Sequence, residues 1–199
     1  MPERSTPLTV ALVAIAFTAM SGLERTVPGA RAQTSSPEAT EAHPEGGPRV
    51  DADLESMQGG RVLLARERGR RVVVLFYEDR PHIEDNSAFK GEVQRFVVDN
   101  HLDDRVVCFG VANLGDVGAT PRMLVRGLIR PIAERWGVDI LLDWEGALRR
   151  PPFSFRTDAA NVALIDREGR IAYRFTDTVD ASARRAFFQA LRRAIAPTR

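Results

Sequence analysis

The stretch VALIDREGRIAYRF, residues 162–175, decides the fold of this 199-residue chain. Two apolar runs flank Asp166-Arg167-Glu168-Gly169, whose residue types are typical of a tight turn between two strands. We therefore expect a strand over residues 161–165 and an antiparallel return over residues 170–175. An amphipathic pattern follows to residue 195 and predicts a closing helix, capped by Asp180 or Ser182.

Two continuous apolar runs precede this hairpin: VVVLFY at residues 72–77 and RVVCFGVA at residues 105–112. Such unbroken runs are typical of strands buried on both faces, as in a parallel sheet covered by helices. Apolar residues at helical spacing follow each run, and residues 138–142 read as a further strand. The order predicts an α/β fold, with a central mixed β-sheet flanked by helices.

Two other stretches carry expectations of their own. Residues 54–68 read as a helical pattern, which Gly59-Gly60 could interrupt. A helix that begins near Arg122 should kink or break near Gly127 and Pro131, because proline lacks the N–H that the helix needs. Arg122, Arg126 and Arg130 recur every four residues, which indicates a solvated face or, alternatively, a surface for an anionic partner.

Composition excludes several classes of protein. The chain has 28 basic and 27 acidic residues, so the net charge of +1 does not favour a nucleic-acid partner. A single cysteine excludes an intramolecular disulfide, a CxxC pair and a zinc site built on several thiolates. The sequence contains no P-loop, GxGxxG, HExxH or GxSxG motif, and we expect no cofactor and no metal.

The N-terminus predicts export. The apolar run at residues 8–20 is shorter than the roughly 20 residues of a membrane span, and the small-x-small site Ala30-Arg31-Ala32 follows it. We expect a signal peptide over residues 1–32, a polar flexible linker over residues 33–48 and one domain over residues 49–199. The location would be periplasmic or secreted, and an uncleaved signal would be the route to any membrane contact.

The element order, closing with residues 162–175 and a helix, resembles the thioredoxin superfamily, in its branch of TlpA-type thiol reductases and peroxiredoxins. Within it the chain is most similar to the YtfJ family of small periplasmic proteins. The shared features are the signal peptide, the polar loop ending at Asn86, the helix start Met123-Leu124-Val125-Arg126 and the turn at residues 166–169. This resemblance implies a thioredoxin-like fold over roughly residues 61–195.

The resemblance also implies that thiol chemistry is absent. Thiol reductases of this branch carry a cysteine pair after the first strand, where this chain has Pro81 and Glu84. The superfamily's cis-proline would fall near Ala160. We therefore expect a protein without a thiol redox centre, with a binding or accessory role in the cell envelope and an envelope protein or a small polar ligand as its partner.

The loop at residues 78–86 is the richest polar cluster and follows the first buried strand, where open α/β sheets place their ligands. We expect a pocket at this edge, beside a helix N-terminus that favours anions or polar ligands. Its candidate residues are Asp79, Arg80, His82, Asn86, Ala160 and Asn161.

Other interpretations stay open at this stage. The loop could be an ordinary solvated one, with Asn86 as a plain helix cap, or an enzyme site in which His82 and nearby carboxylates bind a metal or transfer protons. Cys108, inside a buried run, is expected to be a small apolar filler. Its alternative is a single reactive thiol that works with an external thiol.

Overall fold

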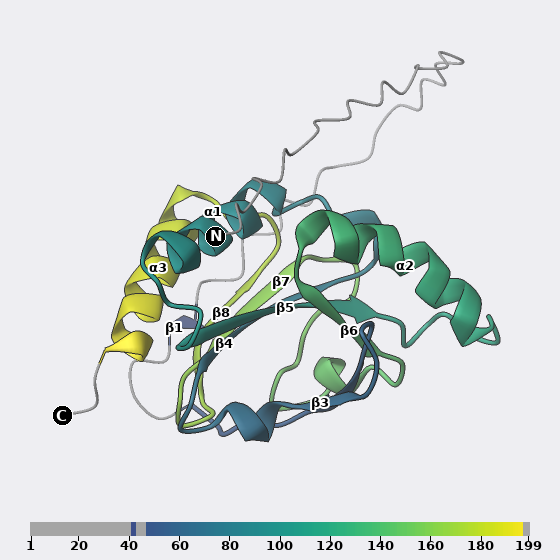
Figure 1. Cartoon of the computed structure of the whole chain (residues 1–199), viewed down its shortest axis with the longest axis horizontal. Helices are drawn as coiled ribbons and strands as arrows, with labels where there is room; N and C mark the ends of the chain where they lie inside the picture. The colour runs from purple at the N-terminus through teal and green to yellow at the C-terminus, as the bar shows by residue number, and fades with distance from the viewer. Residues whose placement is uncertain (1–40, 43–46, 197–199) are drawn as a thin grey trace, which may run out of the picture. The chain divides into compact units, whose positions relative to one another are not determined.

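The computed structural model describes residues 41–42 and 47–196 (Figure 1). The expected signal peptide, residues 1–32, lies outside the described residues. No helix within the described ranges is long and apolar enough to cross a membrane.

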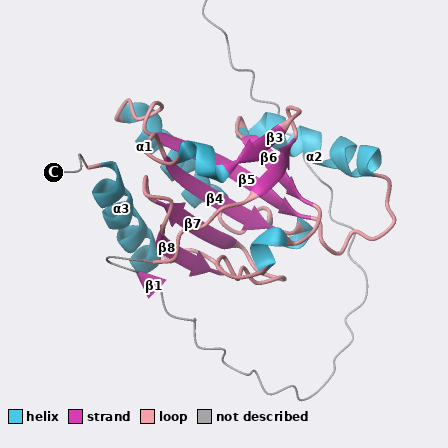
Figure 2. Ribbon diagram, turned by 90° about the horizontal axis from the view of Figure 1, so that it is seen from below, coloured by secondary structure: helices cyan, strands magenta, loops and turns pink. Residues whose placement is uncertain are grey.

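The described chain forms one mixed sheet in the strand order β1-β8-β7-β4-β5-β6-β2-β3, with β7, β4 and β5 side by side in its middle (Figure 2). The pair β4–β5 and the pair β5–β6 are parallel, and every other pair is antiparallel. The strands are β1 (Glu41–Ala42), β2 (Asp53–Ser56), β3 (Arg61–Leu63), β4 (Val72–Glu78), β5 (Val106–Asn113), β6 (Asp139–Asp143), β7 (Asn161–Ile165) and β8 (Ile171–Thr176).

The predicted arrangement of the central strands is confirmed. The apolar runs at residues 72–77 and 105–112 become the parallel neighbours β4 and β5, and all seven residues of β4 are buried. The hairpin is also confirmed, because β7 pairs antiparallel with β8 and Asp166 Oδ1 accepts a hydrogen bond from Arg170 N at 2.8 Å.

Three helices, α1 (Ser87–Asp99), α2 (Arg122–Trp136) and α3 (Ala181–Ile195), lie on one side of the central strands (Figure 1). Alternate residues of β4, such as Val74 and Phe76, pack on this side against aromatic and aliphatic side chains of α1 and α3. The α3 cap is as expected: Asp180 Oδ1 accepts hydrogen bonds from the backbone N–H groups of Ser182 and Ala183.

The other side of the sheet has a different cover. Leu75 and Tyr77 of β4 point to this side, and they join a buried cluster with Leu148, Phe153 and Phe155 from the segment between β6 and β7. The short helices η1 (Leu64–Glu67) and η3 (Ala147–Arg149) belong to this layer, while η2 (Arg80–His82) follows β4. Because both faces are covered, the central strands β4 and β7 are buried at every residue.

The helix expected over residues 54–68 is wrong. This stretch forms β2, β3 and the short helix η1. Gly59 and Gly60 have φ angles of 103° and 76°, which glycine adopts easily, and they turn the chain between the two strands. Strand β2 then extends the sheet by pairing with β6, so tertiary packing overrides the local helical pattern.

The break expected near Gly127 and Pro131 is also wrong, because α2 runs unbroken from Arg122 to Trp136. Proline removes one backbone donor, which leaves the carbonyl of Gly127 without its partner. Both residues lie on the exposed side of α2, so water can satisfy this carbonyl. Gly127 also has no side chain to crowd the proline ring.

The segment predicted to be a linker, residues 33–48, includes strand β1. Its two residues pair antiparallel with β8, with Glu41 opposite Arg174 and Ala42 opposite Tyr173. This strand adds one edge to the sheet, next to the hairpin strand.

Replacing Pro131 by alanine should raise the free energy of unfolding by about 1–3 kcal/mol, because the restored N–H can bond to the Gly127 carbonyl. Urea unfolding followed by circular dichroism measures this change. The matched control is Glu134→Ala, at an exposed position of the same helix, which alters no backbone hydrogen bond. A loss of stability in Pro131→Ala would contradict this description of α2.

Candidate functional site

The loop that follows β4 packs against the segment that precedes β7. Both oxygens of the Asp79 carboxylate are engaged: Oδ1 contacts His82 Nδ1, and Oδ2 accepts a hydrogen bond from Asp158 N at 3.2 Å. The hydrogen bond to Asp79 raises the pKa of His82 above its usual value. Two of the predicted site residues, Asp79 and His82, therefore lie together and close to the chain before Ala160.

Asn86 precedes α1 but does not cap it. Its side chain instead accepts a hydrogen bond from Val179 N at 2.8 Å and donates one to the carbonyl of Asp177 at 3.0 Å. The residue is 3% exposed. Asn86 therefore connects the start of α1 to the loop before α3. The interpretation of Asn86 as a plain helix cap is wrong, because its side chain makes no capping hydrogen bond.

Asn161 is fully buried and joins three segments. Its amide nitrogen donates to the carbonyls of Arg156 and Ala159 at 2.9 and 3.1 Å, and its oxygen accepts from Arg156 N and the Thr176 hydroxyl. It lies opposite Tyr77 in the β4–β7 pair. With every polar atom of its side chain engaged, Asn161 holds the backbone in place at this edge of the sheet.

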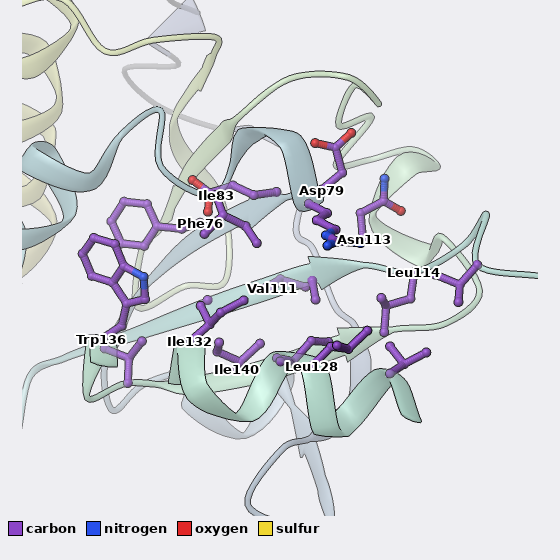
Figure 3. A pocket seen from close by; sticks show the side chains of 18 of the residues that line it. Phe76, Asp79, Ile83, Val111, Asn113, Leu114, Leu128, Ile132, Trp136 and Ile140 are labelled. Atoms are coloured by element: carbon purple, nitrogen blue, oxygen red, sulfur yellow. The ribbon is translucent and has the colours of Figure 1, made fainter. Parts of the chain in front are cut away.

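A cavity of about 500 Å³ opens beside this loop, between α1, α2 and the carboxyl ends of β4 and β5 (Figure 3). Asp79 and Arg80 line it, whereas His82, Asn86, Ala160 and Asn161 do not belong to its lining. Its other lining residues are Phe76, Glu78, Ile83, Lys90, Gln94, Gly110, Val111, Ala112, Asn113, Leu114, Val117, Thr120, Val125, Leu128, Ile129, Ile132, Trp136, Val138 and Ile140.

The cavity exists because β5 has small side chains where α2 crosses it. In the sheet register Phe76, Gly110 and Ile140 lie side by side, and Ala112 lies next to Glu78 in the following row. Because Gly110 has no side chain and Ala112 has only a methyl group, they leave empty space between the larger side chains on the neighbouring strands. The volume falls within the range of roughly 300–1,000 Å³ typical of small-molecule sites.

An ion pair lies at one end of this apolar space. Lys90 Nζ donates to Glu78 Oε2 at 2.5 Å and to the carbonyl of Ile83 at 2.8 Å, and both charged side chains are only 9% exposed. The ammonium also lies 4.9 Å from the ring centroid of Trp136, a cation–π distance. The carboxyl end of β4, the start of α1 and the end of α2 thus meet at Lys90.

Two polar atoms at this end have no partner. The indole nitrogen Trp136 Nε1 is buried and makes no hydrogen bond within the described part of the chain. In Figure 3 this nitrogen is on the side of the ring that faces the other lining side chains. The second oxygen of Glu78, Oε1, forms no hydrogen bond among residues 41–42 and 47–196, but unlike the indole nitrogen it is not one of the buried atoms without a partner. At the end near Lys90, the cavity therefore offers the donor Trp136 Nε1 and the acceptor Glu78 Oε1 to a ligand.

Burial gives Glu78 an unusual acidity. Desolvation raises its pKa to about 7, although the charge and hydrogen bond of Lys90 act in the opposite direction. A carboxyl group with this pKa exchanges its proton near neutral pH, as a general acid or base does. Among the described residues, no group of three or more His, Cys, Asp or Glu side chains could hold a metal ion.

Cys108 lies in the middle of β5, away from the cavity mouth. It is paired with Val74, five residues before the strand end at Asn113, which is roughly 17 Å along a strand. Burial raises the pKa of its thiol to about 12, so the thiolate form is scarce at neutral pH. Cys108 packs on the hydrophobic core beneath α1 and α3.

The most polar part of the cavity was missed at the level of sequence. The predicted polar loop includes Glu78, but Lys90 lies 12 residues further along the chain, in α1, and Trp136 lies at the end of α2. One signal was available: Lys90 is the one lysine in a chain of 28 basic residues. A compact ammonium suits a buried position on an indole face better than a wide guanidinium.

No protein-family model and no curated protein matches the sequence. Solved structures share the fold. A DsbF homologue from Corynebacterium diphtheriae superposes with a TM-score of 0.58 at 13% identity, over 82% of this chain and 96% of its own. A thiol-disulfide isomerase from Corynebacterium glutamicum gives 0.56 at 16% identity, over 76% and 98% of the two chains.

An exposed lipoprotein thioredoxin from Streptococcus pneumoniae gives a TM-score of 0.52 at 19% identity, over 72% of this chain and 99% of its own. Identities this low establish the fold alone. The predicted thioredoxin-like α/β fold is confirmed.

The buried carboxyl of Glu78 predicts a pH-dependent stability. Its pKa is about 7 in the folded protein, compared with 4.5 for an ordinary glutamate, so the folded state binds more protons between these values. Stability should therefore fall as pH rises from about 4.5 to about 7, by roughly 3 kcal/mol. Glu78→Gln should flatten this fall in urea unfolding across the pH range.

Glu145→Gln, which removes an exposed carboxylate, is the matched control and should keep the wild-type slope. His82 also has a raised pKa and loses its stabilising proton as pH rises. The variant His82→Asn therefore measures how much of the pH dependence of stability comes from His82 rather than from Glu78. An unchanged slope in Glu78→Gln would show that Glu78 is ionised throughout the range.

Proposed function

We propose that this chain is a thioredoxin-fold binding protein of YtfJ type, exported to the cell envelope, that works without a thiol redox centre. The observation that carries the proposal is the loop between β4 and α1. It contains no cysteine, and an apolar cavity with a buried ion pair opens beside it. A binding role fits this arrangement better than electron transfer.

The position and acidity of Cys108 support the absence of thiol chemistry. A reactive cysteine needs an electropositive setting that lowers its pKa, whereas Cys108 is half-buried in an apolar setting that raises it. Cys108 lies in the middle of β5, where it pairs with Val74 of β4, and desolvation raises the pKa of its thiol. A disulfide within the chain would also need a second cysteine, which the sequence does not contain.

The cavity supports a binding or accessory role. Its walls are mainly aliphatic and aromatic and its polar groups are few, as in small-molecule sites, and the buried ion pair lies at the end near Trp136. This lining favours a ligand with more apolar surface than the small polar ligand expected from the loop sequence. Asp79 and Arg80, at the cavity, are the expected site residues that such a ligand would contact.

Export is supported by the N-terminal sequence. The apolar run at residues 8–20 and the Ala30-Arg31-Ala32 site form a signal pattern. One of the proteins that share the fold is described as an exposed lipoprotein, which places a related architecture outside the cytoplasm. The envelope is then the compartment in which this chain would meet its ligand or partner.

The proposal predicts redox inactivity. In an insulin-reduction assay with dithiothreitol, and in a peroxide-consumption assay, the wild-type chain should give the same rate as Cys108→Ser. The reason is that the one thiol lies half-buried in an apolar setting and is largely protonated at neutral pH. Turnover above background that disappears in Cys108→Ser would overturn the proposal and favour a protein that works through a single thiol.

The proposal also predicts processing at the N-terminus. Expressed with its native leader in a bacterial host, the protein should be recovered from the periplasmic fraction with a mature N-terminus at Gln33. Mass spectrometry of the intact protein reads the cleavage position, and Ala32→Arg should block it because the site requires a small residue. Full-length protein confined to the cytoplasm would contradict export.

A further inference from the structure

We propose that the cavity between β5 and α2 binds an uncharged amphiphile: a flexible apolar chain with a hydroxyl head group that contacts Glu78 and Trp136. This inference rests on the proposed binding function and names the class of ligand. Three features carry it, namely the shape of the apolar space, the two polar atoms without partners and the balance of charge around them.

The apolar space is long enough for a chain. In Figure 3 the lining side chains extend from Trp136 and Phe76 at one end, past Ile140, to Leu114 and Asn113 at the other. The floor along this path is formed by the small residues of β5 at positions 110 and 112. An aliphatic chain that lies along β5 would fill the space that these residues leave empty.

The rim gives such a ligand a way in. Leu128 of α2 belongs to the cavity lining and is 67% exposed, and Leu124, one turn earlier, is 59% exposed. Large apolar side chains at this degree of exposure on a single helix face are uncommon in a water-soluble domain. They extend the apolar lining from the inside of the cavity to the surface of the molecule.

The polar end selects a group that can both donate and accept a hydrogen bond. Trp136 Nε1 is a donor without an acceptor, and leaving it so costs about 1–3 kcal/mol. Glu78 Oε1 is an acceptor without a donor. Both side chains contact Lys90, so the two atoms lie at the same end of the cavity. A hydroxyl oxygen that accepts from the indole N–H can donate its proton to Glu78.

The charge around the head group argues against an ion. Glu78 and Lys90 neutralise one another, and at the mouth Asp79 and Arg80 contribute one charge of each sign. A carboxylate or an ammonium head would be attracted by one member of the Glu78–Lys90 pair and repelled by the other, so little net attraction would offset the loss of its hydration. A neutral head avoids this penalty.

The test compares three probes with the same chain: octanol, octanoate and octylammonium. Isothermal titration of the purified full-length chain at about pH 8, where the two charged probes are ionised, gives each affinity. We expect octanol to bind in a one-to-one ratio, about tenfold or more tightly than either ion, because the head group discriminates. Equal affinities for all three would overturn the proposal, since they would indicate unselective apolar adsorption.

Variants locate the site. Ala112→Leu should fill the floor of the cavity and weaken octanol binding about tenfold or more, without lowering the melting temperature, because the added methyl groups occupy empty space. Trp136→Phe keeps a six-membered aromatic ring but removes the five-membered ring with its N–H, and should weaken octanol binding roughly threefold to tenfold. Octanol binding that is unchanged in both variants would place it elsewhere.

Trp144→Phe is the matched control. Trp144 lies outside the cavity lining, and its indole nitrogen already donates to Glu55 Oε2 at 2.9 Å, so octanol affinity should not change. If octanol fails to bind the wild-type chain, the ligand class is overturned. The absence of thiol chemistry is judged separately by the Cys108→Ser assays, so the two proposals can fail independently.

Discussion

The ion pair between Glu78 and Lys90 is the contact on which the arrangement around the cavity depends. Lys90 holds the carboxyl end of β4 through Glu78, the following loop through the carbonyl of Ile83, and the end of α2 through the ring of Trp136. Gln94, one turn further along α1, donates to the carbonyl of Trp136 at 2.9 Å. Removing one partner of such a pair leaves a buried charge uncompensated, which is far costlier than losing a surface ion pair.

This contact lies beside the loop between β4 and α1, which contains no cysteine. The loop here is held by other means: Asp79 contacts His82 and the backbone of Asp158, while Asn86 bonds to the backbone at Asp177 and Val179. The edge of the sheet is thus kept rigid by hydrogen bonds to the main chain. An apolar cavity lies beside this loop. The cavity, together with a loop that contains no cysteine, is why we propose binding rather than electron transfer.

The central strands could be predicted from the sequence because each is a continuous apolar run, and the turn at Asp166–Gly169 has few structural alternatives. The strand at β2 could not, since Leu54 and Leu64 have a spacing that suits a helix as well as two strands joined at Gly59-Gly60. Asn86 and Asn161 were selected as site residues because they are polar and near the expected edge. Their actual hydrogen bonds span 91 and 15 residues of sequence, for example to Asp177 and Thr176, and no local pattern encodes such partners.

The cavity itself was beyond the reach of sequence patterns for a related reason. Gly110 and Ala112 look like ordinary strand residues until the register places them beneath α2, between Phe76 and Ile140. The central claim is that this space, rather than a thiol, is the working part of the molecule. A crystal structure of the protein soaked in a bromine-tagged octanol tests it most directly. The account predicts an anomalous bromine peak between β5 and α2, with the hydroxyl oxygen beside Trp136 Nε1. A cavity without bromine, in crystals that bind the compound elsewhere, would contradict it.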